Sequence, residues 1–326
     1  MSFISVLFAL LIEQARPLGP RNRAHAMLRV WVRWSACNFD AGKAAHGWLT
    51  WGFAVGAPSM ASMLIYWLLH MTIGWAAALL WSVAVLYVTL GFRQFSFHFT
   101  QIRDALADGD ESLARDLLAR WQHIDASELP QSEIVRHVIE HSVIAAHRHV
   151  FGVLAWFSVL AAFGFGPAGA VLYRVAEFVA RYWRGDTKHR HQSTSEALQQ
   201  TARRAWRYID WIPARITAVS FAVVGSFEEA MDGWRQHERQ LDGDNDALIL
   251  AATAGAVNIQ LGKASANLSK LDDSATSESP TANISAYTTG QISELAQMAV
   301  IVGLVWRTVV MWILLLALLT LARLLG

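Results

Sequence analysis

The chain has 326 residues, of which 54% belong to the hydrophobic set and 16% are charged. An average soluble domain carries roughly 25% charged residues, so this composition excludes intrinsic disorder and disfavours a water-soluble globule. Lys and Arg number 27 against 26 Asp and Glu, and the formal net charge of +1 supplies no general basic field for nucleic acid. The single cysteine, Cys37, excludes an intramolecular disulfide and a metal site built from several cysteines. The composition favours a membrane protein with substantial polar loops.

The N-terminal segment before Glu13 is apolar but short. It has no positive n-region and no small-residue cleavage site, so a cleaved signal peptide is not expected. We expect a short helix that enters the membrane or lies against the helical bundle.

Two long apolar runs, 49–69 and 72–92, contain no charged residue and are separated only by His70 and Met71. About 20 apolar residues cross the hydrocarbon core as a helix, so the two runs predict a transmembrane hairpin. Aromatic residues that favour the membrane interface lie near the ends of these runs: Trp48, Trp67, Trp75 and Tyr87.

Two further apolar stretches, 149–165 and 168–183, are separated by a break that contains Gly166 and Pro167. We expect them to form a third and a fourth membrane helix, which would return the chain to the side from which it entered.

Residues 296–322 form the longest apolar run, which only Arg307 interrupts. A cation within a bilayer is costly unless it is paired or faces a cavity. Arg307 therefore either pairs with a carboxylate, for which Glu13 and Glu177 are candidates, or marks the cytosolic end of a span over 308–325.

Basic residues indicate the side of the membrane on which the polar segments lie. Residues 14–47 and 184–207 are rich in Arg and Lys, which places both in the cytoplasm under the positive-inside rule. The hairpin crosses twice, so 93–148 belongs on the same side. We expect an all-α polytopic protein of the bacterial inner (plasma) membrane, with about five to seven membrane helices and a cytosolic amphipathic helical layer.

Within a single membrane domain that covers 1–326, we expect two large polar segments. The first is a cytosolic helical loop at 93–148. The second is a polar loop at 226–294, in which the Ser/Thr/Ala-rich residues 265–290 are expected to be mobile.

Residues 100–123 predict two helices joined by a turn at Asp108-Gly109-Asp110, and 131–149 predicts a further helix after Pro130. The apolar stripes of the first two helices are Ile102 and Leu106, then Leu113, Leu117 and Trp121.

His137, Glu140 and His141 match the H-x-x-E-H pattern of inverted zinc peptidases. On a helix the two histidines share a face, but a catalytic zinc needs a third protein ligand. Glu177 and Glu196 are candidates that no motif marks. The alternative is a polar helix whose histidines are solvated or touch lipid headgroups.

Arg148 lies at the mouth of the third apolar stretch. A guanidinium there either binds an anionic substrate or lipid phosphate through its planar fork, or serves as an ordinary membrane anchor.

Four short motifs follow one another along the chain: DGDESLAR at 108–115, GPAGAVLYR at 166–174, WIPARITA at 211–218 and AGAVNIQLG at 254–262. In that order they resemble the "GD-x-x-x-AR", "GPxGA…YK", "IPARLTA" and "AGALGVxLG" motifs of the CobD/CbiB family of inner-membrane cobalamin-biosynthesis proteins. The resemblance extends over most of the chain.

The resemblance implies an adenosylcobinamide-phosphate synthase, which joins adenosylcobyric acid to an aminopropanol or its phosphate through an amide bond. Such chemistry uses ATP and magnesium, and carboxylates hold the metal. Several acidic positions of the family pattern are changed here. The "ExxxEN…DG" helix keeps only Glu140, residues 177–181 replace "NTxDSM", and the acidic pair before "IPARLT" falls at Trp206-Arg207. ATP and magnesium are therefore implied only if synthase activity is retained.

The related AmpE branch, an inner-membrane protein linked to signalling for β-lactamase induction, resembles other parts of the chain. These are Leu10–Glu13, Arg148 in place of an acid, and Asp210–Arg215 (DWIPAR), which is similar to "DWVPVR". Three functions stay open: a synthase-like cobalamin-biosynthesis protein, a non-catalytic AmpE-like sensor or accessory protein, and a membrane zinc hydrolase on His137 and His141.

In the cobalamin interpretation, Glu140, Arg148, Arg174 and Arg215 would line a cavity that faces the cytosol. Arginines there suit phosphate or carboxylate groups. The expected partners are the lipid bilayer, a corrinoid or another anionic small molecule, and a second copy of the chain, with no nucleic acid among them.

Overall fold

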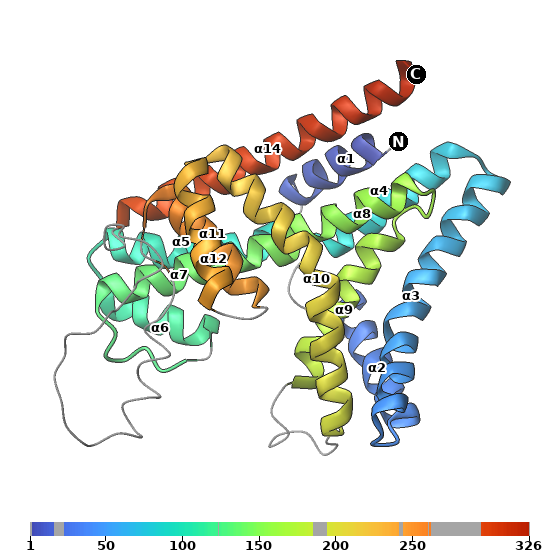
Figure 1. Ribbon diagram of the computed structural model, residues 1–326, viewed down its shortest axis with the longest axis horizontal. Helices are drawn as coiled ribbons and strands as arrows, with labels where there is room; N and C mark the ends of the chain where they lie inside the picture. The colour runs from blue at the N-terminus through green and yellow to red at the C-terminus, as the bar shows by residue number, and fades with distance from the viewer. Residues whose placement is uncertain are drawn as a thin grey trace. The chain divides into compact units, whose positions relative to one another are not determined.

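The computed structural model describes residues 2–15, 23–122, 124–184, 194–240, 244–259, 261 and 295–325. These residues form helices joined by turns (Figure 1). The elements are α1 (Ser2–Ala15), α2 (Arg23–Phe39), α3 (Ala44–Thr72), α4 (Trp75–Thr89), α5 (Phe92–Ala107), α6 (Glu111–Gln122), α7 (Gln131–Ala146), the π-helix η1 (His147–Phe151), α8 (Gly152–Ala162), α9 (Ala168–Arg184), α10 (Glu196–Val224), α11 (Phe227–Gln240), α12 (Asn245–Val257) and α14 (Leu295–Leu325).

The all-α membrane fold is confirmed. In the described part of the chain, three helices are long and apolar enough to cross a membrane: Ala45–Thr72, Gln131–Ala162 and Ala296–Ala322. Shorter apolar helices cover Phe3–Ala15, Trp75–Thr89 and Asn245–Val257.

Large apolar side chains on these long helices face outward. On α3, Leu64 and Leu68 are 60% and 62% exposed, and on α14, Leu318 and Leu319 are 62% and 63% exposed. Soluble monomers rarely expose contiguous apolar surface of this kind. Such faces can contact lipid, because the backbone groups of each helix are already hydrogen-bonded within the helix.

The third and fourth apolar stretches differ from the expectation. The third does not begin near residue 149, because one helix runs from Gln131 through η1 to Ala162. The fourth forms α9, which carries Arg174, Glu177 and Arg181 and is not among the apolar helices found in the described residues. Arg174, Glu177 and Arg181 recur at helical spacing, so one face of α9 carries charged residues and the rest of the helix is largely apolar.

The chain divides into two units, of which the first comprises residues 1–96, 145–216 and 309–326. Its hairpin is confirmed: α3 and α4 pack together and turn at Gly74, whose φ of 109° favours glycine. Helix α9 packs against both α3 and α8. The approach of α8 and α9 is close, because a Cβ on Gly169 would lie 2.0 Å from the Trp156 carbonyl oxygen.

The second unit comprises residues 97–144 and 217–308. The predicted turn between α5 and α6 is confirmed: Gly109 has a φ of 79°, and an Asp110 carboxylate oxygen accepts a 2.9 Å hydrogen bond from the Leu113 amide. The apolar stripe of α5 is buried at Ile102 and Leu106, as predicted. The stripe of α6 was assigned wrongly, because Leu113 is exposed and the buried positions are Ala114 and Leu118.

The segment 226–294, expected as a polar loop, contains the helices α11 and α12. They pack closely, since a Cβ on Gly255 would lie 2.2 Å from the Glu229 carbonyl oxygen. This contact gives the AGAVNIQLG motif a packing role. The expected mobile segment 265–290 lies outside the described residues.

Candidate functional site

The first unit contains a turn of π-helix, η1, between α7 and α8. The Gly152 amide donates to the His147 carbonyl oxygen, five residues earlier. Single π-turns inside α-helices occur frequently at functional sites. Here the wider turn presents His147, Arg148 and His149 in succession, and His147 is fully buried.

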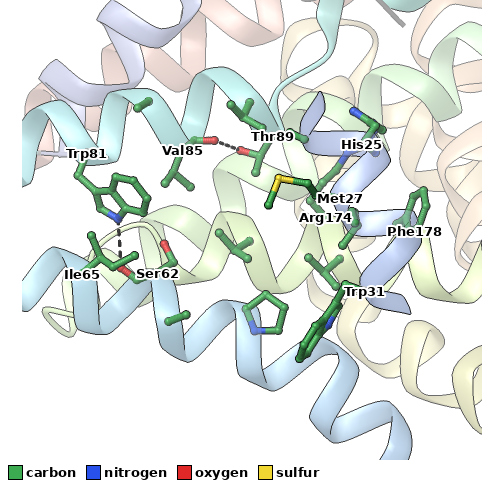
Figure 2. A pocket seen from close by; sticks show the side chains of 18 residues that line it. His25, Met27, Trp31, Ser62, Ile65, Trp81, Val85, Thr89, Arg174 and Phe178 are labelled. Atoms are coloured by element: carbon green, nitrogen blue, oxygen red, sulfur yellow. Dashed lines mark hydrogen bonds between the residues drawn. The ribbon is translucent and has the colours of Figure 1, made fainter. Parts of the chain in front are cut away.

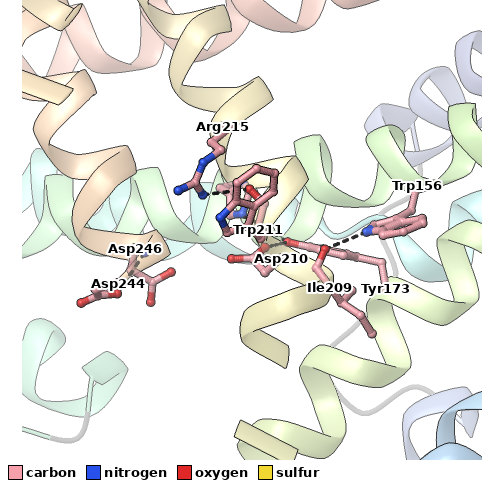
Figure 3. Close-up of polar contacts among 9 residues, drawn as sticks. Trp156, Tyr173, Ile209, Asp210, Trp211, Arg215, Asp244 and Asp246 are labelled. Atoms are coloured by element: carbon pink, nitrogen blue, oxygen red, sulfur yellow. Dashed lines mark hydrogen bonds and ion pairs between the residues drawn. The ribbon is translucent and has the colours of Figure 1, made fainter. Parts of the chain in front are cut away.

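His147, Tyr173 and Asp210 form a buried polar cluster that joins η1, α9 and α10. Tyr173 Oη donates to Asp210 Oδ1 at 2.7 Å, and His147 Nε2 lies 2.9 Å from the same oxygen. Figure 3 shows the contact between Tyr173 and Asp210. An ionised carboxylate only accepts hydrogen bonds, so His147 Nε2 donates. His147 Nε2 is also 3.2 Å from Tyr173 Oη.

This cluster stabilises the ionised form of Asp210. Burial raises the pKa of Asp210, but its charge interaction with His147 and the hydrogen bonds from His147 and Tyr173 outweigh burial and lower the pKa below its ordinary value. The close packing of Tyr173 depends on Gly152, where a Cβ would lie 2.1 Å from Tyr173 Cζ.

Four residues of the segment 210–215 (DWIPAR) have a structural role at this junction: Asp210, Trp211, Pro213 and Arg215. Pro213 lies inside α10 and has no amide hydrogen, so the carbonyl oxygen of Ile209 loses its helical donor. Trp156 Nε1 of α8 donates a 3.0 Å hydrogen bond to that oxygen (Figure 3). Arg215 stacks on Trp211, with 4.0 Å from Cζ to the ring centroid.

A cationic cluster, which we define as Arg148, Arg174 and Arg181, lies beside the polar cluster. Glu177 pairs with two of its members: its Oε2 is 3.1 Å from Arg174 Nη1, and its Oε1 is 3.4 Å from Arg181 Nε. Burial lowers the pKa of Arg174, Glu177 opposes this shift, and the charges of Arg181 and Arg148 add to it. Arginine nevertheless stays protonated in proteins. Because Glu177 is shared by two guanidinium groups, it does not neutralise both of them, and the remaining positive charge suits an anion.

A cavity of about 600 Å³ extends from Arg174 between α2, α3, α4 and α9 (Figure 2). His25 and Arg174 lie at one end, and Ile65 and Trp81 lie at the other. The wall is largely apolar. Two of its polar groups bond within the protein: Trp81 Nε1 donates to the Ser62 carbonyl oxygen at 3.1 Å, and Thr89 Oγ1 donates to that of Val85 at 2.9 Å. The Ser62 hydroxyl has no hydrogen-bond partner among the described residues.

The structure brings together some of the expected site residues. Arg148 and Arg174 belong to the cationic cluster, and Arg174 also lines the cavity. Arg215 instead stacks on Trp211, and neither it nor Arg148 contributes to the cavity wall. Glu140 lies in the second unit, where its Oε1 is 3.9 Å from Arg136 Nε.

The H-x-x-E-H residues also lie in the second unit. The ring of His141 meets that of Trp121 edge-on with centroids 4.5 Å apart, and the His137 carbonyl oxygen accepts a hydrogen bond from Gln122 Nε2. Among the described residues, no group of three His, Cys, Asp or Glu side chains is placed to hold a metal ion. No third zinc ligand is therefore found for His137 and His141 in this part of the chain.

The sequence alone assigned no role to Tyr173, Asp210 or Arg181, and it offered His147 only as a candidate extra imidazole donor beside the H-x-x-E-H pattern. Asp210 and Tyr173 both lie in the motifs that were noticed, and Asp210 directly precedes WIPAR. The available signal was Asp210 itself: an acid beside an apolar motif is costly to bury without a polar partner, which predicts a buried polar contact.

These features define an all-α integral membrane protein with a buried polar junction and a cationic cluster. The family model described as "CobD/Cbib protein" matches residues 6–299. The chain belongs to the CobD/CbiB family, as its motifs predicted.

Curated relatives agree with this assignment. The chain is 30% identical over 268 residues to "Cobalamin biosynthesis protein CobD" of Stutzerimonas stutzeri (strain A1501), covering 80% of this chain and 82% of the relative. It is 33% identical over 180 residues to the protein of that name from Chromobacterium violaceum, covering 55% and 54%. A Leptospira interrogans protein of the same name is 29% identical over 195 residues, covering 58% of each chain. No solved structure matches. The names of these relatives favour the cobalamin branch and give no support to the AmpE interpretation.

Proposed function

We propose that this protein is an adenosylcobinamide-phosphate-synthase-like enzyme of cobalamin biosynthesis. It would join adenosylcobyric acid to an aminopropanol or its phosphate through an amide bond, with ATP supplying the free energy. Family membership and the CobD relatives support the pathway. The observation that carries the proposal in this chain is the cationic cluster.

The cluster fits the chemistry of these substrates. Phosphate and carboxylate groups each present two oxygens that a guanidinium group binds through paired hydrogen bonds. Glu177 occupies one Arg174 nitrogen and the Arg181 Nε, which leaves further N–H groups on both arginines for an anion. Arg174 and Arg148 would hold the anionic group of a substrate at η1 and α9.

The polar cluster has a positioning role in this proposal. Tyr173 precedes Arg174 on α9, and its hydrogen bond to Asp210 fixes that turn of α9 to α10. His147 precedes Arg148 on η1 and is fixed by the same carboxylate. Asp210 therefore sets the spacing of two substrate-binding arginines without touching substrate.

Magnesium does not fit the two carboxylates beside these arginines, Glu177 and Asp210. Glu177 is paired with two arginines, and both Tyr173 and His147 contact Asp210. A magnesium ion needs oxygen ligands in near-octahedral geometry, usually one or two carboxylates together with substrate phosphates. The proposal assigns these residues to anion binding and positioning and derives no step through the metal.

Complementation tests the proposed function. A bacterial strain that lacks its own synthase is supplied with cobyric acid, and growth that requires cobalamin is measured with wild type, Arg174→Gln and Arg204→Gln. Arg204 is an exposed arginine of α10 and serves as the matched control. We expect growth with wild type and Arg204→Gln and strongly reduced growth with Arg174→Gln.

Membrane fractions from the same strains control for folding and amount. Absence of growth with wild-type protein that accumulates in the membrane would contradict the proposed function. Equal growth with Arg174→Gln and wild type would leave the pathway intact but contradict the role of the cationic cluster.

A further inference from the structure

The cavity of the first unit has the shape and polarity of an acyl-chain site. Its wall is built mainly from alkyl and aromatic side chains of α2, α3, α4 and α9, and α3 is one of the candidate membrane spans. Trp81 Nε1 and Thr89 Oγ1 on the wall bond within the protein, whereas the Ser62 hydroxyl has no hydrogen-bond partner in the part of the chain that the structure describes. A ligand with many amides, such as a corrinoid, would leave its polar groups without partners on this wall, which is costly. A hydrocarbon chain needs none.

One end of the cavity carries charge. Arg174 lines that end and is 8% exposed, and one of its nitrogens contacts Glu177. Because Glu177 also pairs with Arg181, the single carboxylate does not neutralise both arginines. His25 lies beside Arg174 (Figure 2). Burial and the charges of Arg174, Arg181 and Arg29 lower the pKa of His25, so near neutral pH it offers an uncharged ring with one donor and one acceptor.

Helix α2 places this end of the cavity at the membrane interface. Its outward face exposes Val30 and Trp34 by 69% and 47%, while His25, Met27 and Trp31 of the same helix line the cavity. Exposed Arg29 and Arg33 flank the apolar stripe. A helix with an apolar stripe, aromatic residues and flanking arginines lies in the headgroup region of a bilayer.

We propose that this cavity holds an anionic phospholipid of the surrounding bilayer, with an acyl chain between α2, α3, α4 and α9 and the phosphate at Arg174 and His25. The apolar wall accounts for the chain, the positive excess accounts for the headgroup, and α2 brings both to lipid depth. This inference goes beyond the proposed synthase activity and does not depend on turnover. Because it uses Arg174, lipid and a substrate anion would compete for that guanidinium group.

Native mass spectrometry of detergent-purified protein tests the proposal directly. Wild type, Ala84→Phe and Ala76→Phe are titrated with phosphatidylglycerol or phosphatidylcholine, and bound lipids are counted. Ala84 lines the cavity, whereas Ala76 is an exposed residue of the same helix, α4, that does not. The two substitutions are chemically identical, so Ala76→Phe controls for added apolar bulk.

We expect wild type and Ala76→Phe to retain one phosphatidylglycerol in preference to phosphatidylcholine. Ala84→Phe fills space needed by the acyl chain, and excluding even two methylenes should weaken retention about tenfold. Inorganic phosphate at millimolar concentration should not displace the lipid, because it lacks the chain.

Two results would overturn the proposal: equal phosphatidylglycerol binding by Ala84→Phe and Ala76→Phe, or no preference for the anionic lipid. Ala61→Phe on α3, which also lines the cavity, replaces Ala84→Phe if that variant does not fold. None of these readouts depends on synthase activity, so failure here leaves the complementation result unaffected.

Discussion

Trp156 and Ile209 are joined by a hydrogen bond that Pro213 makes necessary. The Ile209 carbonyl oxygen would accept from residue 213 in an uninterrupted helix, but proline has no amide hydrogen. Trp156 Nε1 donates to that oxygen instead, at 3.0 Å. The proline of the IPAR motif thus leaves a carbonyl oxygen of α10 without its helical donor, and α8 supplies a hydrogen bond to that oxygen.

The same device occurs a second time in the first unit. Pro58 lies inside α3, and the carbonyl oxygen four residues earlier, on Ala54, accepts a 3.0 Å hydrogen bond from Trp31 Nε1 of α2. Trp31 and Pro58 both line the cavity. Two internal prolines therefore serve as attachment points between helices rather than as helix ends.

Trp156→Phe should destabilise the protein by about 1–3 kcal/mol, because the Ile209 carbonyl loses its donor while an aromatic ring of similar shape remains. Adding Pro213→Ala should recover part of this loss, since an alanine at that position supplies the missing helical amide. The free energy of unfolding, measured by denaturant titration in detergent for both single variants and the double variant, checks this cycle.

Additive changes in the free energy of unfolding for the two substitutions would contradict this prediction. If the two substitutions destabilise independently, Trp156 and Pro213 do not act on one carbonyl.

Asp210→Asn should be among the most damaging single substitutions in the first unit. It removes the carboxylate that accepts hydrogen bonds from His147 and Tyr173 inside the protein, and hydrogen bonds to a charged group are worth about 1.5–3 kcal/mol each. Tyr173→Phe is the matched comparison, because it deletes only a hydroxyl donor at the same oxygen and should cost about 0.5–1.5 kcal/mol. Unfolding free energies at neutral pH check the order, which a larger loss for Tyr173→Phe would contradict.

The Asp210 contribution should depend on pH in a defined direction. Its pKa is lowered in the folded state, so the folded protein binds fewer protons at this group than the unfolded chain does. The stabilisation is present above the unfolded pKa of about 3.9 and is lost as the pH falls through that value towards the folded pKa.

We therefore expect the stability difference between wild type and Asp210→Asn to shrink between about pH 5 and about pH 3. Unfolding titrations of both proteins over this range measure it. A difference that stays constant or grows on acidification would show that Asp210 is not held ionised in the fold.

The cytoplasmic position of residues 93–148 stays a prediction, and cysteine labelling tests it. Asp116 is exposed on α6, so Asp116→Cys in a Cys37→Ser background introduces a single reactive thiol. We expect a membrane-impermeant maleimide to label it in inside-out vesicles and not in intact cells, because the basic residues of 14–47 place that side in the cytoplasm. Labelling in intact cells would show that this segment lies outside the cytoplasm and would contradict the prediction.

The sequence predicted those parts of the fold that depend on local pattern. The uncharged runs 49–69 and 72–92 became α3 and α4, and Asp108-Gly109-Asp110 became the turn before α6. Periodicity could not reveal the π-turn at His147, nor that Arg174 and Glu177 of α9 would be buried, since both depend on neighbouring helices.

The candidate site was predictable only in part, for the same reason. Arg148 and Arg174 stood out as cations beside apolar segments, and the structure places them in one cluster. The contact of His147 with Asp210 joins residues 63 positions apart in the chain, and no single motif encodes it. Only the packing of η1, α9 and α10 brings the two together.

The most direct test of the central claim is synthesis of the product by the purified protein. Wild type in detergent or nanodiscs is incubated with adenosylcobyric acid, aminopropanol phosphate, ATP and magnesium, and adenosylcobinamide phosphate is quantified by mass spectrometry. We expect ATP-dependent product that falls at least about tenfold in Arg174→Gln and persists in Arg204→Gln. Absence of product from folded wild type, under conditions in which the Stutzerimonas stutzeri relative forms it, would contradict the account.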